Sequence, residues 1–345
     1  MNLKFFPDYS KYDKYQKILY SESQKNNFIV NPLINPFNIS NDTEIVHFHW
    51  IHAIWKIINV EPKDFVNQGF PGLFDYKNKG IKTVWTIHNT LPHETNDFKS
   101  EIALMQKFSD ESDVIHIMLK EGLEEIEKYI KIDHNKVFFR QNASYNNVLK
   151  NNNFEKNNKI KLGISENSTV IGCIGQIRPY KNIEMLLNAY LNLREKHENI
   201  YLLVAGLNKD KVSVEKIIKE SYFDKNIILI DRFIDDKEFS EISNAIDIAA
   251  YTYKDILNSG SAYTSFTFGH HVILPKLNTL KSLSNLIFVS FFEPESLNSL
   301  IKVLDNAIKS KKYLNLKKEC VEWNLKNNSS FLSNDFFNEI RMRLS

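Results

Sequence analysis

Short apolar runs alternate with amphipathic stretches throughout the first half of the chain. The strand-like runs are residues 44–50, 82–88, 114–119 and 136–142. The helical stretches between them are residues 52–60, 98–113 and 120–130. Strands that alternate with helices are typical of parallel βαβ units, because each helix returns the chain to the same end of the sheet. The first half is therefore predicted to form a doubly wound α/β domain.

The same alternation restarts after the polar segment 150–160, "KNNNFEKNNKI", which has the composition of a linker. The strand-like runs are residues 169–177, 200–206, 226–233 and 246–253. The helical stretches are residues 182–197, 212–220, 237–245 and 261–268, and residues 319–344 read as two closing helices. We expect two Rossmann-like domains, 1–155 and 156–320, with a cleft between them.

Composition narrows the class of protein. Hydrophobic residues make up 43% and charged residues 25% of the 345 residues, which is typical of a chain that folds on its own. At this length two domains are expected, since single cores rarely grow beyond about 250–300 residues. The formal net charge of +2 lacks the basic excess of a dedicated nucleic-acid-binding protein, so no nucleic-acid partner is expected.

The cysteines and the lengths of the apolar runs indicate in which cellular compartment the protein is expected. Cys173 and Cys320 lie far apart in no metal-ligand spacing, so we expect neither a disulfide nor a zinc site. No run reaches the roughly 20 apolar residues of a membrane span, and the N-terminus lacks a signal-peptide core. We expect a cytoplasmic protein. Lysines interleaved with aromatic residues over 1–20 would suit peripheral contact with the inner face of the cytoplasmic membrane, although a solvated edge gives the same pattern.

Two common nucleotide-binding devices are absent from the sequence. It has no GxxxxGK[ST] motif and no Asp-x-Asp pair, and Gly172 and Gly175 form only GxxG. A nucleotide would have to be bound without a P-loop and without a carboxylate pair holding Mg²⁺. No metal and no cofactor is therefore expected.

Two other elements of the second half suit an anion. Arg178 and Lys181 follow Gly175 at the carboxyl end of a strand, where α/β proteins bind ligands and where the two cations could neutralise a diphosphate. The turn Asn258, Ser259, Gly260 and Ser261 enters a helix, whose first N–H groups attract anions. The plainer alternatives are solvated surface cations and an ordinary serine helix cap.

Five segments together carry a resemblance to a known family. They are "HFHW" at 47–50, "VWTIHNTLPHE" at 84–94, "GQIRPYKNIEMLLNAY" at 175–190, "LLVAG" at 202–206 and "YKDILNSGSAYTSFTFGHHVILP" at 253–275. In this order they resemble bacterial glycosyltransferases of the GT-B fold, similar to glycosyltransferase family 4 and its relatives that build cell-surface polysaccharides.

The resemblance implies a sugar-nucleotide donor on the second domain and an acceptor on the first. Donor-binding residues would be Gly175, Arg178, Lys181, Arg232, Asn258, Ser259, Gly260 and Ser261. The helices of residues 321–345 would cross back to the first domain. Family 4 members usually carry two glutamates eight positions apart near this turn, whereas here Asp255 and Tyr263 stand at that spacing. Because this glutamate pair is absent, the resemblance does not identify the residues that would contact the ribose and the sugar.

The segment "TVWTIHNTLPHE" would place candidate acceptor-binding and catalytic side chains in the first domain. Acceptor-binding residues would be His49, Trp50, His88, Asn89 and His93. An inverting transfer needs a general base near the attacking hydroxyl, and His88 or Glu94 would suit that task, whereas a retaining transfer could use the donor phosphate. The catalytic residues would thus be His88, Glu94, Arg178 and Lys181. In the alternatives, His47 and His49 pack a polar interface, His88 is a satisfied structural histidine, and Glu94 caps a helix that begins near Asn96.

The sequence as a whole predicts a metal-independent glycosyltransferase. It would move a sugar from a nucleotide-sugar donor to a glycan or lipid-linked saccharide in capsule, exopolysaccharide or lipopolysaccharide biosynthesis. A sugar-nucleotide epimerase or a phosphorylase on the same fold is an alternative within enzymes. A catalytically silent glycan-binding partner is the alternative outside them, and the absent glutamate pair supports it.

Overall fold

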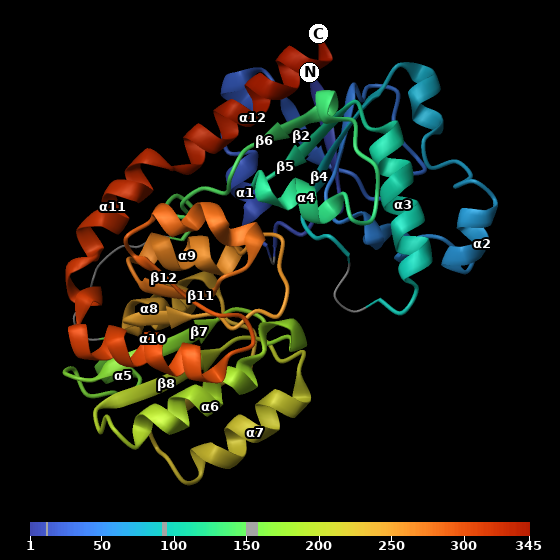
Figure 1. Ribbon diagram of the computed structural model, residues 1–345. Coiled ribbons are helices and arrows are strands. Elements are labelled where there is room, and N and C mark those ends of the chain that lie inside the picture. The colour runs from blue at the N-terminus through green and yellow to red at the C-terminus, as the bar shows by residue number, and fades with distance from the viewer. Residues whose placement is uncertain (12, 92–94, 150–157) are drawn as a thin grey trace. The chain divides into compact units, whose positions relative to one another are not determined.

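The structure, a computed structural model, describes residues 1–11, 13–91, 95–149 and 158–345 (Figure 1). The chain forms two compact units. Unit 1 comprises Met1–Ala143 together with Ser329–Ser345, and unit 2 comprises Ser144–Asn328. The unit limits at 143 and 328 differ from the domain limits of 155 and 320 expected from the sequence.

Unit 1 is built on a six-stranded sheet of order β2-β1-β3-β4-β5-β6 in which every described strand pair is parallel. Its strands are β1 (Asn2–Phe6), β2 (Ile29–Pro32), β3 (Ile45–Phe48), β4 (Lys82–Ile87), β5 (Val114–Ile117) and β6 (Val137–Phe139). The strand order reverses between β1 and β3, and ligands of open α/β sheets bind beside such a switch point at the carboxyl ends of the strands.

The helices of unit 1 include one from the far end of the chain. They are α1 (Tyr15–Leu19), α2 (Pro62–Asn67), α3 (Phe98–Glu111), α4 (Glu121–Ile126) and α12 (Ser329–Leu344). Figure 1 shows α12 beside α1, although about 310 residues separate them in sequence. The contact is aromatic, since the Phe337 ring lies 4.5 Å from that of Phe28 and the Phe336 ring stacks on His47 at 5.0 Å. The last helix therefore completes the core of unit 1.

The N-terminal segment is more ordered than its sequence indicated. No element was expected in residues 1–43, yet β1 lies inside the sheet between β2 and β3. Phe5, Phe6 and Tyr15 are buried. These aromatics were part of the sequence basis for peripheral membrane contact, and their burial in the core removes them from any such surface. None of the helices in the described part of the chain is both long enough and apolar enough to cross a membrane.

Unit 2 contains a second six-stranded sheet of order β12-β11-β10-β7-β8-β9, again parallel in each described pair. Its strands are β7 (Thr169–Ile174), β8 (Ile200–Ala205), β9 (Ile227–Ile230), β10 (Ile248–Ala250), β11 (His271–Pro275) and β12 (Val289–Phe292). This is the dinucleotide-fold order, with its switch point between β7 and β10. The doubly wound parallel architecture expected for both halves is confirmed.

The helices of unit 2 largely follow the apolar periodicity of the sequence. They are α5 (Asn158–Lys161), α6 (Ile183–Arg194), α7 (Lys211–Ser221), α8 (Asp236–Ala245), α9 (Gly260–Phe268), α10 (Leu297–Ser310) and α11 (Lys317–Lys326). In α6 the residues at helical spacing from Ile183 to Leu193 are buried, as their periodicity indicates. The sequence did not indicate α10, and the stretch 52–60 forms only a 3-10 helix over Ile51–Lys56.

One glycine fixes the path of the chain after β7. Gly206 follows β8 with a φ of +148°, and a β-carbon there would lie 2.2 Å from the carbonyl oxygen of Gly175. The residues after β7 and β8 therefore approach more closely than any side chain would allow. This contact holds the start of the Gly175 loop against the end of β8.

We expect Gly206→Ala to destabilise unit 2 by at least about 2 kcal/mol more than Gly163→Ala, because only the first replacement creates a backbone clash. Gly163 is a matched control, since its φ is also positive at +73° and a β-carbon there would meet nothing within 4 Å. Urea unfolding followed by circular dichroism measures both losses. Equal losses would show that the backbones at Gly206 and Gly175 can separate at little cost.

Candidate functional site

The carboxyl end of β7 brings three of the predicted donor-site residues together. Gly175 leaves the strand with a φ of +113°, a conformation that favours glycine. A β-carbon at this position would lie 3.1 Å from Nζ of Lys181 and 3.5 Å from Oγ of Ser261. An ammonium, a hydroxyl and an unobstructed stretch of backbone therefore meet at the switch point of the second sheet.

Lys181 is the unusual member of this group. It is only 4% exposed, and no carboxylate among the described residues forms an ion pair with it. Burial lowers the pKa of its ammonium, the neighbouring Cys173 thiol opposes this, and the Arg178 cation adds to it. A buried cation is costly unless an anion meets it. Among the described residues the Lys181 ammonium therefore has no negative partner, and an anionic ligand would supply one.

Ser259 performs the plainer of its two predicted roles. Its Oγ accepts a hydrogen bond of 3.0 Å from the N–H of Ala262, which makes it the cap of α9, and lies 2.7 Å from the Tyr253 hydroxyl. Gly260 is exposed at the first position of the helix, and Asn258 is half-buried just before it. The capped turn directs the first N–H groups of α9, where the helix dipole is positive, to the same sheet edge as Gly175.

The two predicted donor-site arginines differ in placement. Arg178 is half-buried beside the Gly175 loop, and its Nε donates a hydrogen bond of 2.9 Å to Oε1 of Gln176. Arg232 is exposed beyond β9 and forms a two-pronged ion pair with Glu238. Because β8 lies between β9 and β7, Arg232 leaves the sheet about 10 Å from Gly175 at ordinary strand spacing. The structure does not gather it with the other donor-site residues.

The two positions that replace the usual glutamate pair lie in different surroundings. Asp255 is exposed, whereas Tyr263 is fully buried. The Tyr263 ring lies 5.4 Å from that of Phe266 and 5.9 Å from that of Trp323 on α11. Tyr263 therefore belongs to the packing between α9 and α11 and offers no carboxylate at this position.

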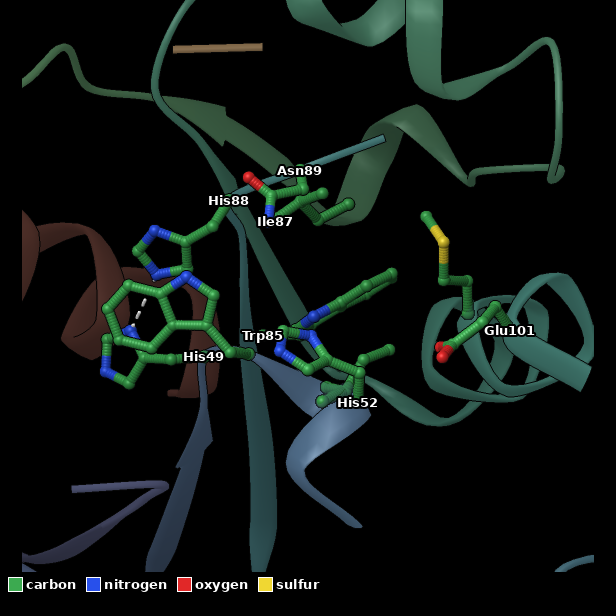
Figure 2. A pocket seen from close by; sticks show the side chains of 10 residues that line it. His49, His52, Trp85, Ile87, His88, Asn89 and Glu101 are labelled. Carbon is green, nitrogen blue, oxygen red and sulfur yellow. Dashed lines mark hydrogen bonds between the residues drawn. The ribbon is translucent and has the colours of Figure 1, made fainter. Parts of the chain in front are cut away.

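The predicted acceptor-side residues of unit 1 also come together. His88 follows β4 and Trp50 follows β3, and their rings stack at 4.0 Å with an interplanar angle of 17°. Nε2 of His88 lies 3.1 Å from Nδ1 of His49, as the dashed line in Figure 2 shows. His49, Trp50, His88 and Asn89 line one pocket of about 30 Å³. His93 and Glu94, the remaining predicted residues of this loop, lie outside the described residues.

The same pocket contains a carboxyl group that the sequence analysis missed. Glu101 on α3 lines it and is 5% exposed (Figure 2). Burial raises the pKa of this carboxyl to about 7, although the Trp55 and Thr95 side chains act against this by hydrogen bonding. A carboxyl that titrates near neutrality can act as an acid or a base. A signal was present, since Glu101 falls on the apolar stripe that Leu104 and Phe108 continue.

The cap of α3 bears on the alternative role of Glu94. The helix begins at Phe98, and Oδ1 of Asp97 accepts a hydrogen bond of 3.1 Å from the N–H of Ser100. Asp97 therefore caps the helix that was expected to begin near Asn96.

The histidines do not form a metal centre in the part of the chain that the structure describes, where no three His, Cys, Asp or Glu side chains converge as ligands. His47 and His116 are fully buried under Phe336, and their nitrogens contact hydroxyls and a backbone carbonyl. For His47 the polar-packing alternative therefore describes the structure.

The chain is similar to known glycosyltransferases in part of its sequence and in its fold. Residues 154–255 match the sequence model of the family described as Glycosyl transferases group 1. A comparison with curated proteins finds no matching sequence.

Three solved structures illustrate the likeness in fold. HepE from Anabaena, in a complex with UDP and glucose, is 11% identical with a TM-score of 0.74, and the alignment covers 99% of this chain and 100% of that chain. A glycosyltransferase from Rickettsia africae is 14% identical with a TM-score of 0.66, covering 99% and 97%. Sucrose-phosphate synthase from Thermosynechococcus elongatus is 12% identical with a TM-score of 0.67, covering 87% and 73%. The GT-B fold expected from the sequence is confirmed.

Burial of the histidines predicts a loss of stability in acid. It lowers the pKa of His116 to about 4, whereas a histidine in the unfolded chain titrates near 6.5. The unfolded state therefore binds more protons between these values, and the stability associated with His116 falls as the pH drops from 6.5 to 4. The slope for one such residue is about 1.4 kcal/mol per pH unit.

We expect His116→Gln to make the free energy of unfolding less dependent on pH by about this slope between pH 6 and 4.5. Glutamine cannot titrate, and its amide can still donate to the carbonyl that His116 contacts. Urea unfolding of both proteins across that range measures the difference. The pH dependence that Glu101 contributes has the opposite sign, because its raised pKa adds stability that is lost as the pH rises from about 4.5 through 7. This contribution is the same in both proteins and cancels when their curves are compared. Parallel curves would contradict the prediction.

Proposed function

We propose that this chain is a metal-independent glycosyltransferase that moves a sugar from a nucleotide-sugar donor to a saccharide or lipid-linked glycan. The observation that carries the proposal is the buried Lys181 beside Gly175 and Ser261, at the switch point of a dinucleotide-fold sheet. This surrounding suits a diphosphate. The match of residues 154–255 to Glycosyl transferases group 1 falls on the same region and supports the assignment.

On the donor side, unit 2 would hold the diphosphate without a metal. Lys181 and Arg178 supply positive charge, and the first turn of α9 supplies N–H groups and the positive end of a helix dipole. These groups would stabilise the negative charge that grows on the departing nucleotide diphosphate. UDP-sugars are the first donors to test, because HepE has been solved with UDP and with UDP-glucose.

On the acceptor side, the pocket of unit 1 suits part of a saccharide. Trp50 and Trp85 offer apolar faces, and His88, Asn89 and Glu101 offer polar groups. The volume of about 30 Å³ is small, so we propose that only part of a sugar enters the pocket. His88 or Glu101 could accept the proton of an attacking hydroxyl if the transfer inverts the anomeric centre.

The wider role remains the one that the sequence resemblance suggests. We propose assembly of a bacterial surface polysaccharide, whether capsule, exopolysaccharide or lipopolysaccharide, on the cytoplasmic side of the membrane. A lipid-linked acceptor would bring the enzyme to the membrane surface, so the enzyme would not need a membrane-binding segment for this role.

Nucleotide binding tests the donor site directly. We expect UDP, among UDP, GDP, CMP, dTDP and ADP, to raise the melting temperature, and to do so equally with Mg²⁺ and with EDTA. A ligand at 100 times its Kd adds about 2.7 kcal/mol to stability, which gives a visible shift. A shift that requires Mg²⁺ would contradict metal independence. The absence of a shift with every nucleotide would favour a catalytically silent glycan-binding protein.

We expect Lys181→Met to abolish the nucleotide-induced shift and to lower turnover about 10²-fold, while the ligand-free protein stays at least as stable. Methionine fills about the same space and removes a buried cation that has no acidic partner among the residues the structure describes. Calorimetric unfolding with and without UDP measures both effects. Lys302→Met on the exposed face of α10 removes the same charge elsewhere in unit 2 and should change neither. Wild-type binding by Lys181→Met would place the diphosphate elsewhere.

A further inference from the structure

A continuous row of hydrogen-bonded side chains runs across three adjacent strands of unit 1 and ends at His88. Its side chains come from β5, β4 and β3, from His49 just after β3, from Tyr20 after α1, and from the loop that follows β4, and its far end is the backbone carbonyl of Arg140 after β6. Parallel pairing places them side by side, since Thr86 is the direct register partner of His116. From one end to the other the contacts are Arg140 O to His116 Nε2, 3.0 Å; His116 Nδ1 to Thr86 Oγ1, 3.1 Å; Thr86 Oγ1 to His47 Nε2, 2.7 Å; His47 Nδ1 to Tyr20 OH, 2.8 Å; Tyr20 OH to His49 Nε2, 2.7 Å; and His49 Nδ1 to His88 Nε2, 3.1 Å.

The surroundings favour the neutral form of every ring of this row, of which only that of His88 is half-buried and not fully buried. His47, His49 and His116 are at most 1% exposed, and no carboxylate among the described residues pairs with them or with His88. Burial, followed by repulsion between neighbouring rings, holds the pKa of His47, His49 and His88 well below the usual value. A neutral imidazole has one N–H and one bare nitrogen. Each ring can therefore donate on one side only.

The backbone carbonyl of Arg140 decides the direction of the first bonds. A carbonyl only accepts, so Nε2 of His116 carries the proton and its Nδ1 is bare. Two hydroxyls lie near Nδ1 of His116, that of Thr86 at 3.1 Å and that of Tyr15 at 3.4 Å. The nearer one, Thr86, is assigned as the donor, because otherwise its lone pairs would face the bare nitrogen. Once the threonine proton is used there, Nε2 of His47 has to donate to Thr86.

The remaining bonds follow in the same direction. Nδ1 of His47 is bare, so Tyr20 donates to it, and the Tyr20 oxygen in turn accepts from Nε2 of His49. Nδ1 of His49 is then bare and accepts from Nε2 of His88. Every proton in the row points away from His88 and toward the carbonyl of Arg140.

We propose that this row locks His88 in a single tautomer, with the proton on Nε2 and a bare Nδ1 that accepts a hydrogen bond from a ligand. Thr86, His47, Tyr20, His49 and His116 are then positioning residues, none of which needs to touch the ligand. In Figure 2 the other ring nitrogen of His88 lies on the side opposite the dashed bond to His49. None of the described residues forms a hydrogen bond with it.

The lock has a consequence for which chemical groups the site accepts. A bare imidazole nitrogen attracts a hydroxyl or N–H and repels the lone pairs of a phosphate or carboxylate oxygen. The position beside His88 therefore selects a donor, for which a saccharide hydroxyl is the candidate under the proposed function. The tautomer itself does not depend on that function, since it is set in the ligand-free protein.

Nitrogen NMR of the ligand-free protein tests the lock. In histidine labelled with ¹⁵N, long-range ¹H–¹⁵N correlations distinguish a protonated from a bare ring nitrogen, and the signals missing in His88→Gln identify His88. We expect the wild-type spectrum at pH 7.5 to show Nε2 protonated and Nδ1 bare for His88. A protonated Nδ1, or averaging between the two tautomers, would overturn the proposal without any bearing on nucleotide binding by unit 2.

Variants of Thr86 show whether the distant row is responsible. Thr86→Val keeps the shape and removes the hydroxyl, so we expect the signals of His88 to become those of a tautomer mixture, and Thr86→Ser to restore the single form. Tyr15→Phe is the matched control, because it removes a hydroxyl 3.4 Å from Nδ1 of His116 that is not a link of the row. It should leave His88 in one tautomer. An unchanged His88 in Thr86→Val would contradict control by the row, and the wild-type spectrum decides the tautomer even if that variant does not fold.

Discussion

Parallel pairing of the strands is the constraint on which both units depend. Each described strand pair runs in the same direction, so all the carboxyl ends of a sheet meet at one edge. Helices cover the faces of such sheets, and this leaves that edge as the place where polar side chains can gather. His88 and Trp50 at one sheet, and Gly175 with Lys181 at the other, are products of the same geometry.

The two units satisfy their buried polar groups in opposite ways. In unit 1 the ring nitrogens of His47 and His116, under Phe336, are all paired with hydroxyls or a carbonyl, and only Nδ1 of His88 at the end of the row is left for a ligand. In unit 2 the ammonium of Lys181 is buried near another cation and has no acidic partner in the described residues. A complete network rigidifies its surroundings, whereas an incomplete one favours an incoming counter-charge. The first arrangement suits orientation of a ligand, and the second suits its capture.

The sequence predicted strands β3 to β6 and β7 to β10 because their signal is local. Apolar runs such as that of β7 are continuous, and the periodicity of α6 matches its buried face. The first strand was missed because Asn2–Phe6 is short and Lys4 interrupts it, although it becomes central once β2 and β3 pair with it. Glu101 was missed although it falls on the apolar stripe of α3, because a carboxylate can also stand at the solvated edge of such a stripe and only the structure shows that it is buried. Arg232 was grouped with the donor site by family resemblance. The sequence predicted helix α8, but it could not show that Glu238 in the first turn of this helix forms an ion pair with Arg232.

The return of α12 to unit 1 has a consequence for how the chain is made. Unit 2 is one uninterrupted segment, Ser144–Asn328, whereas unit 1 needs Ser329–Ser345 to cover Phe28 and His47. A ribosome delivers the N-terminal strands first, yet the helix that closes their core emerges only after the whole of unit 2. During synthesis the N-terminal domain usually folds first, and this order of folding is therefore expected to be reversed here. Unit 2 can therefore be complete while Phe28 and His47 are still without the cover that α12 provides.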